Sequence, residues 1–253
     1  MTLYHLIFFL TAVTAVFIQS KSRTLQDLPE ELMNEDLHNE LSRLLKIRRF
    51  MSPFIAGLTA LLILMITARH QLWNETLPRF FVPVWALASI GDIYIEGAYS
   101  IEDKKKQERF YLIGMILFMA MTLLLGIGLM VNAGAAASGR IARIISIGLP
   151  VLLGIGAFFT MKLDKDTLGP MIVYDVAVSV LLCGGLFALF AGQYQMAYIG
   201  MGYFISDWLV GTRDFGKWKP AFLDRWILLF ILLIYYSIMI LSVDGVLKLV
   251  PAV

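Results

Sequence analysis

At 253 residues, with 59% hydrophobic and 16% charged residues, the chain carries more apolar surface than a soluble domain of this length can bury. Its mean hydropathy of +0.76 is typical of a polytopic membrane protein. The net charge of +2, with basic residues scattered between apolar runs, argues against a nucleic-acid partner. The single cysteine, Cys183, excludes a disulfide framework within the chain.

Apolar windows of about 17–25 residues, long enough to cross a hydrocarbon core of ~30 Å, occur eight times. They predict an all-α fold and one helical membrane domain over 1–253, with a first helix (1–19), an amphipathic connecting segment (20–50) and a seven-helix core (51–253). No Lys or Arg precedes the first window and no small-residue cleavage site follows it, so we interpret it as a retained helix. The windows are 2–19, 52–68, 80–97, 110–131, 142–161, 170–191, 194–212 and 225–249.

Short features between and within these windows predict how neighbouring helices meet. Only Gly192 and Gln193 separate the sixth window from the seventh, which predicts a tight antiparallel hairpin. Glycines within the windows, Gly126, Gly184 and Gly200 among them, are expected to allow close contacts between helices.

The connecting segment is polar, yet leucines recur in it at three- and four-residue spacing. Asp27 followed by Glu30 resembles a capping box, and Pro29 suits an early helical position. We therefore expect an amphipathic helix over 28–49 on the cytoplasmic face of the membrane. It is interpreted as a linker at the interface, with docking of a protein partner through 25–49 as the alternative.

The distribution of basic residues predicts an orientation. In and beside the segments that join the predicted helices, 16 of the 21 Lys and Arg residues fall on one side of the membrane and five on the other. Because basic residues concentrate on the cytoplasmic side, this pattern predicts a multi-pass protein with both termini on the non-cytoplasmic side.

Ionisable residues within the predicted helices are the candidate functional positions, because each costs roughly 2.5–3.5 kcal/mol to insert. In the predicted orientation three helices bring them to one layer, roughly 7–8 Å below the inner boundary. A purely structural cluster, in which Asp92 and Glu96 pair with Arg109, Arg213 or Arg225, is the alternative. The layer contains Asp92, Tyr174, Asp175 and Asp207, with Tyr94 close to Asp92 in the sequence and Ser206 next to Asp207.

Two buried carboxyl groups in one layer suit acid–base chemistry, in which one donates a proton and the other accepts one. We expect no metal and no other cofactor, because His5, His38 and His70 all fall outside the layer. A P-loop and an HExxH motif are also absent from the sequence. A retinal protein needs a Lys deep in a late helix, and the last window has only Lys248 at its far end.

The order of the motifs resembles the YhhN-type lysoplasmalogenase family of membrane proteins. The resemblance covers roughly 80–250 and depends on the Gly91-Asp92 and Ser206-Asp207 pairs, Tyr174 and the paired tyrosines of the last helix. Two departures are Thr122, where the family typically has a histidine, and Ser237-Ile238, where it has Ala-Gln. The motifs are "GDIYI" (91–95), "FYLIGMILF" (110–118), "YFISDWLVGTRDF" (203–215) and "YYSIMIL" (235–241).

The resemblance implies hydrolysis of the vinyl ether bond of alkenyl lysophospholipids, with a lysophospholipid or another lipid of the bilayer as partner. Asp92 and Asp207 would be the acid and the base, and Tyr174 would orient a reacting group. The expected substrate contacts are Ser206, Asp175, Tyr94 and, near the head group, Arg213. The alternative is a non-catalytic membrane subunit or lipid-binding scaffold, which Thr122 and the amphipathic segment at 20–50 favour. A small transporter is a weaker alternative, because the sequence has no inverted repeat.

Overall fold

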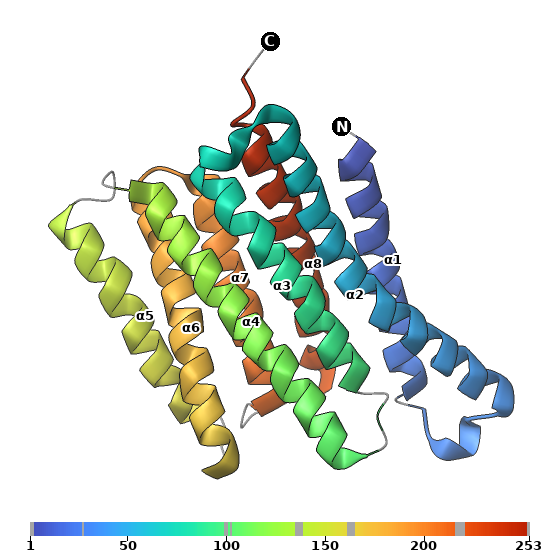
Figure 1. The fold of residues 1–253 in the computed structure, drawn as a ribbon. Coiled ribbons are helices and arrows are strands. Elements are labelled where there is room, and N and C mark those ends of the chain that lie inside the picture. The colour runs from blue at the N-terminus through green and yellow to red at the C-terminus, as the bar shows by residue number, and fades with distance from the viewer. Residues whose placement is uncertain are drawn as a thin grey trace.

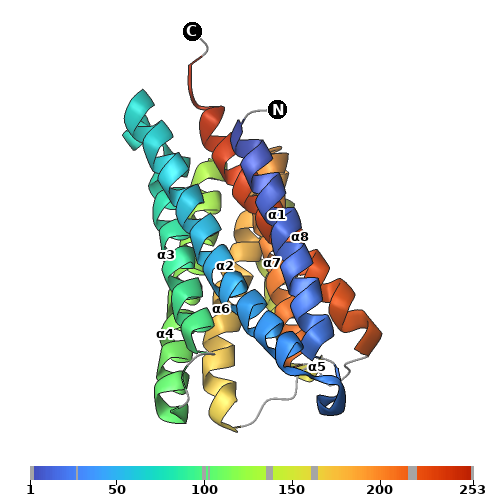
Figure 2. The same ribbon diagram turned by 90° about the vertical axis from the view of Figure 1, so that its right-hand side faces the viewer.

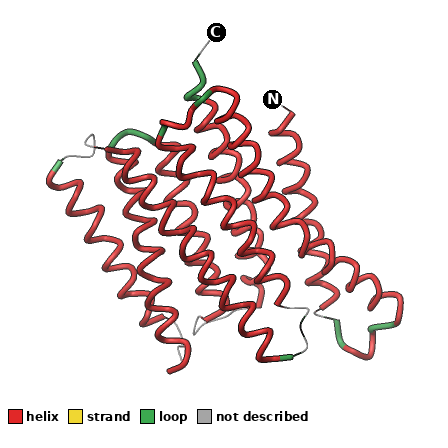
Figure 3. The backbone as a smooth tube through the Cα atoms, viewed as in Figure 1, coloured by secondary structure: helices red, strands yellow, loops and turns green. Residues whose placement is uncertain are grey.

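The computed structural model describes residues 3–26, 28–98, 101, 103–134, 139–160, 165–215 and 221–251. Eight α-helices and two short 3₁₀ turns account for nearly all of this described part, which contains no strand (Figure 3). The predicted all-α class is therefore confirmed. The helices are α1 (Leu3–Gln26), α2 (Glu35–His70), α3 (Thr76–Ala98), α4 (Lys104–Ala133), α5 (Arg140–Thr160), α6 (Lys165–Phe190), α7 (Tyr194–Phe215) and α8 (Ala221–Leu247).

The helices run side by side along one direction, and the chain crosses the bundle from end to end with each helix (Figure 1). Helices α3, α4, α6, α7 and α8 pack successively on one another, α2 packs on α3, and α1 packs on α2 and α8. Helix α5 lies at one edge and packs against α6. The two ends of the described chain lie at the same end of the bundle (Figure 2).

Within the described residues, six helices are long and apolar enough to cross a membrane, namely α2, α3, α4, α5, α6 and α8, and the apolar part of α1, Leu3–Ile18, is shorter. Large apolar side chains point outward, including those of Phe9, Leu152 and Phe159. An outward apolar surface on long apolar helices fits a lipid environment, so the chain is a multi-pass membrane protein. A count of eight crossings remains a prediction.

The connecting segment differs from its prediction. The residues expected to form a separate helix over 28–49 are divided between a 3₁₀ turn at Glu30–Leu32 and the first part of α2, which continues without interruption to His70. Asn34 is the N-cap, and its side chain accepts a hydrogen bond from the backbone N–H of Leu37 at 2.9 Å. The expected cap at Asp27 lies outside the described residues, and Pro29 precedes the 3₁₀ turn rather than starting a helix.

Helix α2 begins at Glu35 because Asn34 satisfies an unpaired N–H at its start. Glu35 and Asp36 follow in the first turn, where the helix dipole favours acidic side chains. Nothing between Glu35 and Ser52 breaks a helix, and Pro53 lies within α2.

Glycines set the close contacts of the central helices. A Cβ added to Gly184 of α6 would lie 2.4 Å from the carbonyl oxygen of Gly126 in α4, and one added to Gly200 of α7 would lie 2.6 Å from the Cα of Gly185 in α6. These contacts confirm the expected role of these glycines in helix packing. The predicted tight hairpin is also present, because Gly192, with a φ of 74°, turns the chain between Phe190 and Tyr194.

Candidate functional site

The first part of the candidate site is a hydrogen-bonded pair between neighbouring helices. The hydroxyl of Tyr174 in α6 donates to the Oδ2 atom of Asp207 in α7 at 2.9 Å. Both side chains are half-buried. A carboxylate within an apolar bundle needs such a donor, because an unpaired buried charge is costly.

This pair lines a cavity between α5, α6 and α7. The cavity has a volume of about 60 Å³, roughly that of two water molecules in the liquid. Trp208 and Leu153 also line it and are 46% and 40% exposed, so the cavity reaches the outer, apolar surface of the bundle. The remaining lining residues are Gly154, Ala157, Met171, Asp175, Val178, Phe204 and Gly211.

Asp175 brings a second carboxyl group to the same cavity. A Cβ added to Gly154 in α5 would lie 2.5 Å from the Oδ2 atom of Asp175, so this carboxyl group lies directly against the backbone of Gly154 and a larger residue there would displace it. The structure thus brings together three of the predicted site residues, Tyr174, Asp175 and Asp207, in one cavity.

Asp92 occupies a separate environment in the interior of the bundle. Its side chain is 9% exposed, and its Oδ2 atom accepts hydrogen bonds from Ser52 Oγ of α2 at 2.7 Å and from the Tyr235 hydroxyl of α8 at 3.4 Å. Among the described residues, hydroxyl groups and not arginines are its partners. Asp92 does not line the cavity at Asp207.

Two tyrosines connect the environments of Asp92 and Asp207. Tyr203 of α7 and Tyr235 of α8 pack edge to face, with ring centroids 6.0 Å apart. Each of them lies close enough to both carboxyl groups to interact with them electrostatically. We refer to the two aspartates and the hydroxyl groups that contact or neighbour them, those of Ser52, Tyr174, Tyr203 and Tyr235, as the polar region.

The other predicted site residues contribute differently. Ser206 is buried in α7. Tyr94 of α3 packs on Phe110 of α4, with ring centroids 5.3 Å apart, and does not line the cavity. Arg213 lies in α7, but its side chain is outside the described part of the chain.

Sequence reasoning missed Ser52, Tyr203 and Tyr235 as parts of this region. The two tyrosines belong to the motifs "YFISDWLVGTRDF" and "YYSIMIL". Aromatic residues are common in membrane helices, so their presence there does not by itself indicate a functional site. Ser52 is the first residue of the predicted apolar window 52–68, where a polar residue is expected at the end of a membrane helix and does not indicate a site. Among the described residues, no group of His, Cys, Asp and Glu side chains could hold a metal ion.

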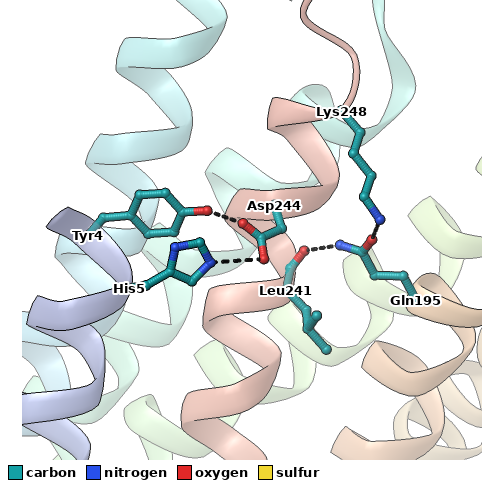
Figure 4. A network of polar contacts seen from close by, with 6 residues as sticks. All are labelled: Tyr4, His5, Gln195, Leu241, Asp244 and Lys248. Carbon is teal, nitrogen blue, oxygen red and sulfur yellow. Dashed lines mark hydrogen bonds and ion pairs between the residues drawn. The ribbon is translucent and has the colours of Figure 1, made fainter. Parts of the chain in front are cut away.

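A second polar cluster lies at the end of the bundle near both termini (Figure 4). Asp244 of α8 accepts a hydrogen bond from the Tyr4 hydroxyl of α1 and lies 3.3 Å from His5 Nε2. Nearby, Gln195 of α7 donates to the carbonyl oxygen of Leu241 at 2.7 Å and accepts from Lys248. The contacts join α1 and α7 to α8, so this cluster has a structural role in the bundle.

A comparison with protein-family models, curated proteins and solved structures found no match. The function is therefore argued from the geometry of the polar region and from the motifs that it contains.

Proposed function

We propose that the chain is a membrane-embedded hydrolase that cleaves the vinyl ether bond of alkenyl lysophospholipids. The observation that carries the proposal is the hydrogen-bonded Tyr174–Asp207 pair in a cavity that is otherwise mostly apolar and that reaches the lipid-facing surface. A carboxyl group in this position can meet a reactive bond that is itself embedded in lipid. The resemblance of the motifs to the YhhN-type lysoplasmalogenase family supports the same activity.

The chemistry requires one proton donor and one water molecule. A carboxyl group donates a proton to the outer carbon of the vinyl ether, which leaves an oxocarbenium ion at the carbon bonded to oxygen. Water adds to that carbon and loses a proton to a carboxylate, and the resulting hemiacetal separates into a fatty aldehyde and the glycerol hydroxyl of the head group. The cavity of about 60 Å³ admits the attacking water beside Asp207, and in this proposal the vinyl ether approaches from the lipid-facing opening, with its alkenyl chain along the exposed side of Trp208.

The geometry favours Asp207 as the carboxyl group that meets the substrate, with Tyr174 as its positioning partner. Asp92 lies in the interior and accepts a hydrogen bond from Tyr235, whose ring packs on Tyr203. In this proposal Asp92 is the second carboxyl group and takes up, by way of these two tyrosines, the proton that the attacking water releases. Thr122 replaces the family's histidine, is fully buried in α4 and does not line the cavity, so the replacement removes no group from this cavity.

The test is aldehyde release from a purified lysoplasmalogen by the detergent-solubilised chain. We expect Asp207→Asn and Asp92→Asn to lower the rate by at least about 100-fold, as is typical for the loss of a general acid or base. Asp103→Asn is the matched control, because Asp103 is the exposed N-cap of α4 and asparagine caps a helix equally well. Release at the wild-type rate by the Asp207 variant, or no release by the folded wild-type protein, would refute the proposal.

A further inference from the structure

A stripe of side chains on α2 changes from basic to aromatic along the helix axis. Arg43, Lys46, Phe50 and Phe54 follow one another at three- or four-residue spacing, so they lie on one face. All four are exposed, the two phenylalanines by 66% and 49%. We refer to these four residues as the α2 stripe.

The aromatic part of the α2 stripe borders a groove between α2 and α3. Phe50 and Phe54 stack with ring centroids 5.4 Å apart, and both line this groove, which has a volume of about 400 Å³. The groove is far more spacious than the cavity at Asp207 and is almost entirely apolar. Its other lining residues are Pro53, Gly57, Leu58, Leu61, Ser89 and Ile93.

Local contacts explain why the groove has this form. The Ser89 hydroxyl of α3 donates to the Pro53 carbonyl oxygen at 2.7 Å, which fixes α3 against α2 at this depth. A Cβ on Gly57 would lie 3.0 Å from Ser89 Oγ, so glycine at 57 allows the close approach and leaves the outer side of the contact open. The groove is therefore formed by specific contacts between α2 and α3.

The charge at the polar end of the groove is positive. Arg43 and Lys46 lie about 6–11 Å before Phe50 along the axis, at 1.5 Å per residue. The nearest acidic residue of α2, Glu40, is already engaged by Lys21 of α1, and Glu35 and Asp36 lie in the first turn. In Figure 1 the first turns of α2 extend to the edge of the molecule, away from α3, and Arg43 and Lys46 are both exposed.

We propose that the α2 stripe and the α2–α3 groove bind one anionic phospholipid, with its phosphate group at Arg43 and Lys46 and an acyl chain along Phe50, Phe54 and the groove. A basic pair one turn above an apolar groove is complementary to an anionic amphiphile at the depth where phosphate meets acyl chain. The basic-residue count predicts that this end of the bundle is cytoplasmic, and the cytoplasmic leaflet is the one rich in anionic lipid. The site is on other helices than the cavity at Asp207, and its occupancy does not depend on hydrolysis.

The test is native mass spectrometry of the full chain in detergent, titrated separately with dioleoyl phosphatidylglycerol and dioleoyl phosphatidylcholine. We expect the wild type to bind phosphatidylglycerol more tightly. In Arg43→Gln/Lys46→Gln that affinity should fall by about 30-fold at low salt, because each basic group near a membrane surface contributes ~1 kcal/mol, while phosphatidylcholine binding is unchanged. The matched control is Lys104→Gln/Lys105→Gln, which removes two exposed charges from the start of α4 and should cost less than threefold.

A second pair of variants tests the groove. Ile93→Trp should fill it and weaken both lipids, whereas Ile116→Trp, at a similarly exposed position of α4, should weaken neither. Equal affinity of the wild type for the two lipids, or equal losses in the two charge variants, would overturn the proposal. The proposal would also be overturned if inorganic phosphate displaced phosphatidylglycerol from the wild type, because the site would then recognise phosphate and not a lipid. A protein that binds the α2 stripe in one-to-one ratio and displaces phosphatidylglycerol would likewise overturn it. Aldehyde release is not part of this test, so its outcome is independent of the proposed hydrolysis.

Discussion

The environment of Asp92 shows how single hydroxyl groups make a carboxyl group tolerable inside the bundle. Ser52 Oγ is its closer donor, at 2.7 Å, and comes from a different helix. We expect Ser52→Ala to lower the free energy of unfolding by about 1–3 kcal/mol, because the substitution leaves a buried acceptor with one donor fewer. Chemical or thermal unfolding in detergent measures the change.

Ser42→Ala is the control for this substitution, because Ser42 is exposed on the same helix and its loss should stay within about 0.5 kcal/mol. If the two variants unfold alike, the Ser52–Asp92 hydrogen bond contributes nothing measurable to stability.

At the scale of elements, α4, α6 and α7 are held together by backbone contacts across glycines. Gly184 has the closest of these, with the Gly126 carbonyl oxygen 2.4 Å from where a Cβ would be. Gly184→Ala should therefore force α4 and α6 apart and destabilise the protein by at least about 1–3 kcal/mol. Gly148→Ala in α5 is the comparison, since a Cβ there meets nothing within 4 Å. Thermal unfolding in detergent measures the difference. Equal melting temperatures for the two variants would show that the close contact at Gly184 does not contribute to stability.

At the scale of the whole molecule, the two connections that flank α3 lie at opposite ends of the bundle (Figure 1). In a Cys183→Ala background, we expect Glu75→Cys and Lys105→Cys to react with a membrane-impermeant maleimide from opposite sides of the membrane, because α3 crosses between them. The basic-residue count predicts that Lys105→Cys is the cytoplasmic one. Labelling of both from one side in sealed vesicles would exclude α3 as a crossing helix.

Much of the fold follows from the sequence, because a long apolar run in lipid has to satisfy its backbone hydrogen bonds within a helix. This rule predicts the hairpin at Gly192 and approximate bounds for most helices. It does not predict the start of α2, where the cap at Asn34 and the continuous helix to His70 differ from the expected interfacial segment. Periodic leucines indicate a helical face, but they do not indicate whether that helix ends before the membrane or continues into it.

For the candidate site, the sequence by itself determined which residues are costly in lipid, and so singled out Asp92, Tyr174 and Asp207. Only the tertiary structure decided their partners: Tyr174 for Asp207, and Ser52 and Tyr235 for Asp92. The insertion cost of a carboxyl group is a property of the residue itself and can be predicted from the sequence of one helix. A hydrogen bond between helices depends on their rotation and separation, which are set by packing contacts such as those of Gly126 with Gly184 and Gly185 with Gly200.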